Sequence, residues 1–161
     1  MTTFDDTGFH DLLVDVEETE NDVTGSSQVI FKFSNGWGAS VVQGPYTYGG
    51  PDGLFELAVL DSNGRLNYDT PVAPDDVVGY LTTEDVKEKL TQLALLTETE
   101  LTEFRTERAK KEFLRALKFL STDFRDVRER SPEAITALPA ELRSAVESIV
   151  NYFDNQEEGN A

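Results

Sequence analysis

Cysteine is absent from the 161-residue chain, and His10 is its single histidine. The chain therefore offers no disulfide, thiolate zinc site or cysteine nucleophile, and a single histidine excludes a His–His metal pair. No stretch approaches the roughly 18 consecutive apolar residues needed to cross a bilayer. The N-terminal segment lacks the basic and apolar regions of a signal peptide. We therefore expect a soluble, cytoplasmic protein.

Basic residues are also scarce, with 14 Lys and Arg against 31 Asp and Glu and a formal net charge of −17. Because phosphate contacts need clustered Lys and Arg, we expect no direct binding of nucleic acid and no attachment to a membrane. Such acidity is typical of a solvated surface that keeps a protein soluble. It also suits a protein that imitates a polyanion.

The charge is distributed unevenly along the chain. Residues 1–24 carry eight carboxylates and no Lys or Arg, whereas residues 105–130 carry nine basic and five acidic side chains. An acidic arm that lies over this basic helix is one possible arrangement, and salt would weaken such a contact. We predict a loosely ordered acidic N-terminal arm over 1–24 that docks through three apolar side chains, Phe9, Leu12 and Leu13. Residues 11–16 are compatible with a short strand or a helical turn, and residues 17–22 have the composition of a charged loop. The alternative is a fully disordered tail.

Residues 25–75 have the pattern of a β-meander. Residues 27–33 are rich in β-branched and aromatic side chains, with Val29, Phe31 and Phe33 alternating toward a core. Asn35-Gly36 predicts a hairpin with a type I′ turn, in which both central residues have positive φ. A second hairpin is expected from 54–60 and 65–70. The sequence thus predicts an antiparallel sheet of four strands.

The rest of the chain is predicted to be helical over 76–153, packing on or beside the sheet, with a flexible tail over 154–161. Residues 77–81 form a short helical turn, and Thr82-Thr83 caps a helix over about 84–96. Thr97 and Glu100 have the spacing of a capping box, which opens a long helix over about 98–120. Shorter helices follow to about 137 and 153. The fold class is therefore α+β.

The loop over 44–53, GPYTYGGPDG, contains four glycines, two prolines and two tyrosines. Because glycine and proline fix the bends of a chain, we predict one defined loop shape. Defined loops that carry aromatic side chains often bind a partner, which makes Tyr46 and Tyr48 candidate contacts. A structural alternative is that the two rings cover the sheet edge.

Three sequence patterns suggest a catalytic or ligand-binding site, but each lacks a feature that its chemistry requires. His10 lies in the arm, without the rigid pocket of a catalytic triad. The glycine spacing over 44–49 resembles a phosphate loop, but Gly50-Pro51 stand where Lys and Ser or Thr are required. Residues 61–69 begin like a calcium loop, but Leu66 replaces the required glycine. We therefore expect no catalytic residue, no metal and no cofactor, and hence no enzyme.

The segment from Phe33 to Tyr68, with SNGWGASVVQGPYTYGG and GLFELAVL, resembles a family of small acidic proteins encoded by bacteriophages. The resemblance covers residues 27–96 at most and leaves out the helical C-terminal part. The family has no assigned activity, so no functional residue is transferred. The resemblance implies a phage origin and the cytoplasm of a bacterial host.

These observations favour a non-enzymatic protein-binding module, an inhibitor that occupies a basic, nucleic-acid-binding surface of a host protein. The candidate contacts are the carboxylates of the arm and the loop tyrosines, namely Asp15, Glu17, Glu18, Glu20, Asp22, Tyr46 and Tyr48. An alternative is a virion or assembly component that self-associates through its long helix. A third hypothesis is a binder of a peptide or metabolite at the 44–53 loop.

Overall fold

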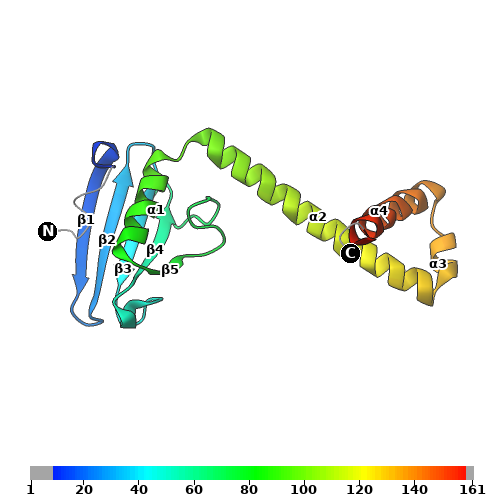
Figure 1. Cartoon of the computed structure of the whole chain (residues 1–161), viewed down its shortest axis with the longest axis horizontal. Coiled ribbons are helices and arrows are strands. Elements are labelled where there is room, and N and C mark those ends of the chain that lie inside the picture. The colour runs from blue at the N-terminus through cyan, green and yellow to red at the C-terminus, as the bar shows by residue number, and fades with distance from the viewer. Residues whose placement is uncertain (1–8, 159–161) are drawn as a thin grey trace. The chain divides into compact units, whose positions relative to one another are not determined.

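The computed structural model describes residues 9–158, which form an antiparallel meander sheet followed by helices (Figure 1). The chain divides after Arg105 into two compact units, the sheet unit (residues up to 105) and the helical unit (residues from 106). Five strands lie in chain order across the sheet: β1 (Leu13–Asn21), β2 (Ser26–Phe33), β3 (Gly38–Gln43), β4 (Phe55–Leu60) and β5 (Val78–Leu81). The predicted α+β class is confirmed, with five strands in place of four.

The additional strand is β1, in the segment that was predicted to be an acidic arm. Residues 13–21 pair with β2, so the charged loop expected over 17–22 is in fact mostly an edge strand. Side chains alternate between the two faces of a strand, and in this register Val16 lies opposite Phe31 and packs against the core. The acidic side chains of an edge strand remain solvated and discourage pairing with other chains. Residues 1–8 of the arm lie outside the described residues.

The return strand predicted over 65–70 is not formed, and this segment meets β4 through an isolated bridge between Leu60 and Leu66. The Asp61 carboxylate accepts hydrogen bonds from the backbone N–H groups of Asn63 and Arg65, at 2.8 and 3.0 Å. These N–H donors, that of Arg65 foremost, lower the pKa of Asp61. Such local bonds compete with a strand ladder. The strand beside β4 is instead β5, which was predicted to be a helical turn.

The turn between β2 and β3 is not the predicted type I′. Among the described residues, positive φ outside glycine occurs at Asp75 and Tyr80, so Asn35 has ordinary backbone angles. The N–H of Gly36 donates to the carbonyl of Phe33 at 3.0 Å, and Gly36 itself has φ +87°. This is a loop one residue longer, in which glycine alone needs the left-handed conformation. The longer loop leaves the Asn35 side chain available for another contact.

The core lies between one face of the sheet and helix α1 (Thr83–Leu95), which crosses the sheet in Figure 1. The alternation predicted for β2 is confirmed, because Phe31 and Phe33 are buried and Val29 packs against the same core. The α1 side chains that fill this core are buried and recur at helical spacing: Val86, Leu90, Leu93 and Ala94. Phe9 joins them, edge to face with Phe33 at 5.5 Å between ring centroids, which confirms the predicted docking of Phe9.

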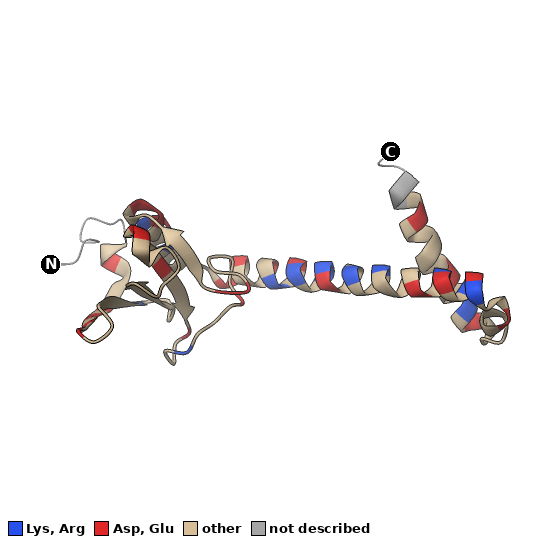
Figure 2. Cartoon of the chain, turned by 90° about the horizontal axis from the view of Figure 1, so that it is seen from below, with Lys and Arg blue, Asp and Glu red and all other residues tan. Residues whose placement is uncertain are grey.

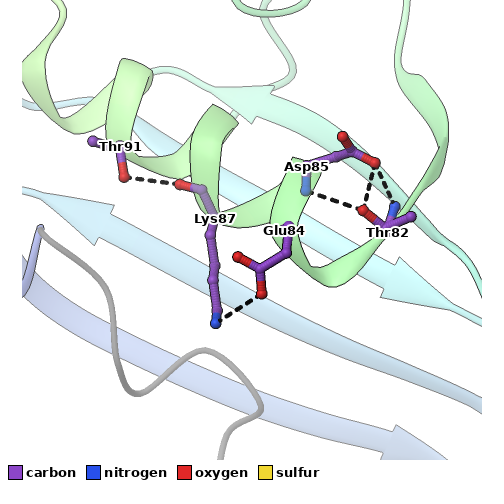
Figure 3. A network of polar contacts seen from close by, with 5 residues as sticks. All are labelled: Thr82, Glu84, Asp85, Lys87 and Thr91. Carbon is purple, nitrogen blue, oxygen red and sulfur yellow. Dashed lines mark hydrogen bonds and ion pairs between the residues drawn. The ribbon is translucent and has the colours of Figure 1, made fainter.

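Both ends of α1 are fixed by side chains of the sheet unit. At the N-terminus, Thr82 and Asp85 form a reciprocal capping box, with Lys87 bonded to Glu84 and Thr91 to the Lys87 carbonyl in the following turn (Figure 3). At the C-terminus, the Asn35 amide donates to the carbonyls of Leu93, Ala94 and Leu96. The hairpin turn therefore serves as a helix cap.

The remaining helices are α2 (Glu98–Arg130), α3 (Pro132–Thr136) and α4 (Ala140–Glu158). The predicted Thr97–Glu100 capping box is confirmed at the start of α2, which runs ten residues beyond its predicted end. Helix α4 continues to Glu158, so residues 154–158 of the predicted tail are helical, and residues 159–161 lie outside the described residues. No helix in the described part of the chain combines the length and apolar character needed to cross a membrane.

Candidate functional site

The loop between β3 and β4 has a defined shape, as its glycine and proline content predicted. The Thr47 hydroxyl donates to the Gly44 carbonyl at 3.0 Å, and the Gln43 amide bridges to the Gly53 carbonyl at 2.6 Å. The short 3-10 helix η2 (Gly50–Asp52) follows within the same loop. These bonds close the loop on itself, so its side chains are displayed from a fixed backbone.

Tyr46 and Tyr48 are both displayed on the surface. Tyr46 is 87% exposed, and Tyr48 is 57% exposed. The N–H of Tyr48 donates to the Glu56 carboxylate at 2.9 Å, and its carbonyl accepts from the N–H of Tyr80 at 3.0 Å. A Cβ at Gly79 would come within 2.3 Å of the Tyr48 Cβ, so glycine is required where β5 meets the loop. The loop therefore meets the β5 edge through its backbone. Both rings remain accessible, so they do not cover the sheet edge as the structural alternative expected.

Tyr80, whose backbone bonds to that of Tyr48, is another exposed tyrosine, which sequence reasoning missed. It is 64% exposed, and its ring carbon Cδ1 lies 3.0 Å from the position a Cβ would take at Gly49. Its φ of +57° is rare for a bulky residue and costs on the order of 1 kcal/mol. Strain of this kind is concentrated at functional surfaces. Tyr46, Tyr48 and Tyr80 are called the tyrosine group below.

The five candidate carboxylates do not form a single patch, because successive side chains of a strand point to opposite faces. Asp15 and Glu17 oppose Lys32 and Ile30, on the face of the sheet away from α1. Glu18 opposes Val29, and Glu20 lies two residues further along the same side. Asp22 follows the strand in the turn. All five are exposed.

Two of these carboxylates lie beside the tyrosine loop. A surface hollow of about 620 Å³, called the loop hollow, is lined by the end of β1, the start of β2 and the 44–53 loop. Glu20 and Asp22 line it from one side, and Gly44, Pro45 and Gly50 from the other. Since Pro45 directly precedes Tyr46, the structure brings together the acidic strand end and the aromatic loop that the sequence had suggested separately.

Asp15 and Glu17 belong to a different environment. The Lys32 ammonium donates to the Asp15 carboxylate at 2.8 Å. This hydrogen bond and the charge of Lys32 lower the pKa of Asp15, and the same contact raises the pKa of Lys32. Glu17 and Lys32 also line a second hollow of about 320 Å³, which includes Trp37. Asp15 is thus already paired, so it is a weaker candidate for partner binding than Glu20 or Asp22.

His10 lies on the surface in the 3-10 helix η1 (His10–Leu12). The described His, Asp and Glu side chains include no group of three that could hold a metal ion. What the surface does present is rigid aromatic area beside negative charge, which is suited to recognition.

The chain matched nothing in comparisons with protein-family models, with curated proteins and with solved structures. The site therefore rests on the geometry alone. Within that geometry, Tyr80 and Gly79 could have been found from the sequence, because Val77-Val78-Gly79-Tyr80-Leu81 has a strand composition. The contact between Tyr80 and Tyr48 could not, since it depends on the pairing of β4 with β5.

Proposed function

We propose that the chain is a non-enzymatic protein-binding module and that it binds its partner through the tyrosine group and the adjoining carboxylates of the loop hollow. One observation carries the proposal: Glu20 and Asp22 line the same hollow as the loop that displays Tyr46 and Tyr48. Tyrosine offers a large amphipathic contact area at a low cost in conformational entropy, and interface hot spots are enriched in it.

The charge of the chain indicates the chemistry of the partner. A net charge of −17 attracts a positively charged protein surface and speeds association through long-range steering. Basic surfaces of this kind are common on proteins that handle nucleic acid. The resemblance of residues 27–96 to phage-encoded acidic proteins supports a bacterial host protein as the target. In this proposal the chain inhibits by occupying the surface that nucleic acid would otherwise use.

The aromatic contribution is tested by capture from bacterial lysate with the Tyr46→Ser variant. Tyr46 stands at the loop tip and is largely exposed, so the substitution removes contact area without touching the core. Loss of a central tyrosine costs about 2 kcal/mol, which corresponds to roughly thirtyfold weaker binding. The matched control is Tyr68→Ser, an exposed tyrosine of the sheet unit that lies outside the tyrosine group. Equal capture by the two variants would refute the proposed surface.

The electrostatic contribution is tested with Glu20→Gln combined with Asp22→Asn. The control pair, Glu88→Gln with Glu103→Gln, removes the same charge from exposed positions elsewhere in the sheet unit. We expect the first pair to slow association with the captured protein and to reduce its salt dependence more than the control pair. Added DNA should then displace the chain from its partner. Binding that DNA leaves unchanged would refute nucleic-acid mimicry while retaining the binding surface.

A further inference from the structure

Helix α2 carries two adjacent apolar stripes within the helical unit, and one of them is exposed. The first contains Phe124, which lines a pocket together with Val146 and Val150 of α4, and Ser121 one turn earlier is buried. The second, called the outer stripe, recurs at spacings of four and three residues and consists of Ala109, Phe113, Ala116 and Leu120. Phe113 is 64% exposed and Leu120 is 48% exposed. A helix with one neighbour needs one apolar stripe, so the outer stripe has the pattern of a second helix contact.

Helix α4 has a complementary outer stripe. Its residues recur at spacings of three and four and are Leu142, Ala145, Ile149 and Tyr152. Leu142 and Tyr152 are about half-exposed, whereas Val150 and Phe153 on the neighbouring stripe are buried. The α2 stripe spans twelve residues and the α4 stripe eleven, so the two have matching lengths of three helical turns.

Charge distinguishes between the possible pairings of these stripes. Residues 106–118 of α2 carry five basic and two acidic side chains, and Figure 2 shows the basic residues recurring along the middle of this helix. Helix α4 carries five acidic side chains and one basic side chain. Two copies of α2 would therefore repel each other, as would two copies of α4. Pairing of α2 with α4 brings opposite charges together.

We infer that the outer stripe of α2 binds the outer stripe of α4 from a second copy of this chain. A two-fold axis then forms the same contact twice, which closes the assembly as a dimer. Each contact buries Phe113 and Leu120 of one copy against Leu142 and Tyr152 of the other. This inference concerns the helical unit and stands apart from the partner-binding surface proposed for the sheet unit.

The test is sedimentation velocity of the full-length protein over a wide concentration range. We expect a monomer–dimer equilibrium in which salt weakens the dimer. Phe113→Glu puts a charge into the apolar contact and should weaken dimerisation by a factor of roughly ten or more. Thr122→Glu, on the opposite face of α2, is the control and should dimerise as the unmodified chain does. Circular dichroism establishes that the variants remain helical. An unmodified chain that is monomeric at every concentration would overturn the inference.

A mixture of two variants identifies which helices pair. Phe113→Glu and Leu142→Glu should each be impaired alone, because each symmetric dimer then has both contacts damaged. In a mixed dimer, the intact α4 of the first variant meets the intact α2 of the second, and one undamaged contact is restored. We therefore expect the mixture to dimerise more strongly than either variant alone. A mixture no stronger than its components would contradict the pairing of α2 with α4.

Discussion

Leu57, Val59, Val86, Leu90 and Leu93 in the sheet unit have no exposed surface, whereas Phe113 and Phe119 in the helical unit are 64% and 68% exposed. Both units are regular in secondary structure, so the contrast lies in packing. The sheet unit covers one face of its meander with α1 and thereby completes a core, while the helical unit leaves apolar stripes on the surface. A layered sheet and helix can bury their apolar residues within one chain, but a few helices need further partners.

The largest effect that separates the two units is expected from Leu90→Ala. Leu90 is fully buried on α1, and removal of its side chain leaves a cavity that costs about 2–5 kcal/mol. Trp37 is the only tryptophan and packs against this core, so its fluorescence reports unfolding of the sheet unit. Circular dichroism follows the helices of both units. The tryptophan transition should move to lower urea while the dichroism transition of the helical unit remains in place.

Leu66→Ala is the matched control for this experiment, because Leu66 belongs to the sheet unit and is 55% exposed. A surface substitution of this kind should change the free energy of unfolding by less than about 0.5 kcal/mol. If Leu90→Ala moved the fluorescence and dichroism transitions together, the two units would unfold as one, and their difference in packing would not separate their stabilities.

A smaller effect is expected from Asn35→Ala, which removes the cap at the C-terminus of α1. The Asn35 amide is the donor for three carbonyls, at 2.9–3.2 Å, and the loss of such a partner costs about 1–3 kcal/mol. Asn35→Asp should cost at least as much, because it places negative charge at the negative end of the helix dipole. Both changes should lower the urea midpoint seen by Trp37 fluorescence.

Asn63→Ala provides the control, because Asn63 precedes glycine in the equivalent turn but lies on the surface, away from any helix end. We expect a change below about 0.5 kcal/mol for this variant. Equal effects at Asn35 and Asn63 would show that the turns matter for their backbone conformation alone. The cap would then contribute nothing measurable to the sheet unit.

The two asparagines also show how far the sequence could predict this molecule. Asn35-Gly36 correctly predicted a hairpin, because the turn depends on neighbouring residues. The capping by Asn35 joins positions nearly sixty residues apart, and no local pattern encodes it. The composition of residues 77–81 favours a strand, but the role of Gly79 depends on a distant contact with Tyr48, which no local pattern encodes. The charged part of β1, residues 17–21, was missed because its composition is that of a loop, and its pairing with β2 overrides that preference.

The same distinction between local and long-range contacts applies to the candidate site. Tyr46 and Tyr48 could be predicted because a loop rich in glycine and proline displays its aromatic side chains wherever it lies. The five carboxylates lie within eight residues of the sequence, over 15–22, but the alternation of β1 separates Glu17 from Glu18. The register of β1 against β2 decides that Glu20, and not Asp15, lies beside the loop. Long-range pairing therefore determines which of the predicted residues can act together.

The smallest effect concerns the other end of α1, where Asp85 accepts hydrogen bonds from the hydroxyl and the N–H of Thr82. These bonds lower the pKa of Asp85 in the folded protein. A carboxyl whose pKa is lower when folded stabilises the fold above its unfolded pKa, and this contribution is lost as the pH falls through the folded value. The stability difference between the unmodified chain and Asp85→Asn should therefore be constant near neutrality and disappear in acid.

Thr82→Ala tests whether the capping box is the cause of this pH dependence. The substitution alone should cost about 1 kcal/mol at neutral pH, the usual contribution of an N-cap threonine. In that background Asp85 has lost its partner hydroxyl, the largest influence on its pKa, so Asp85→Asn should have a smaller effect with a weaker dependence on pH. An unchanged pH dependence in the double variant would locate the cause outside the capping box. The capping box would then not account for the pH dependence of the stability of the sheet unit.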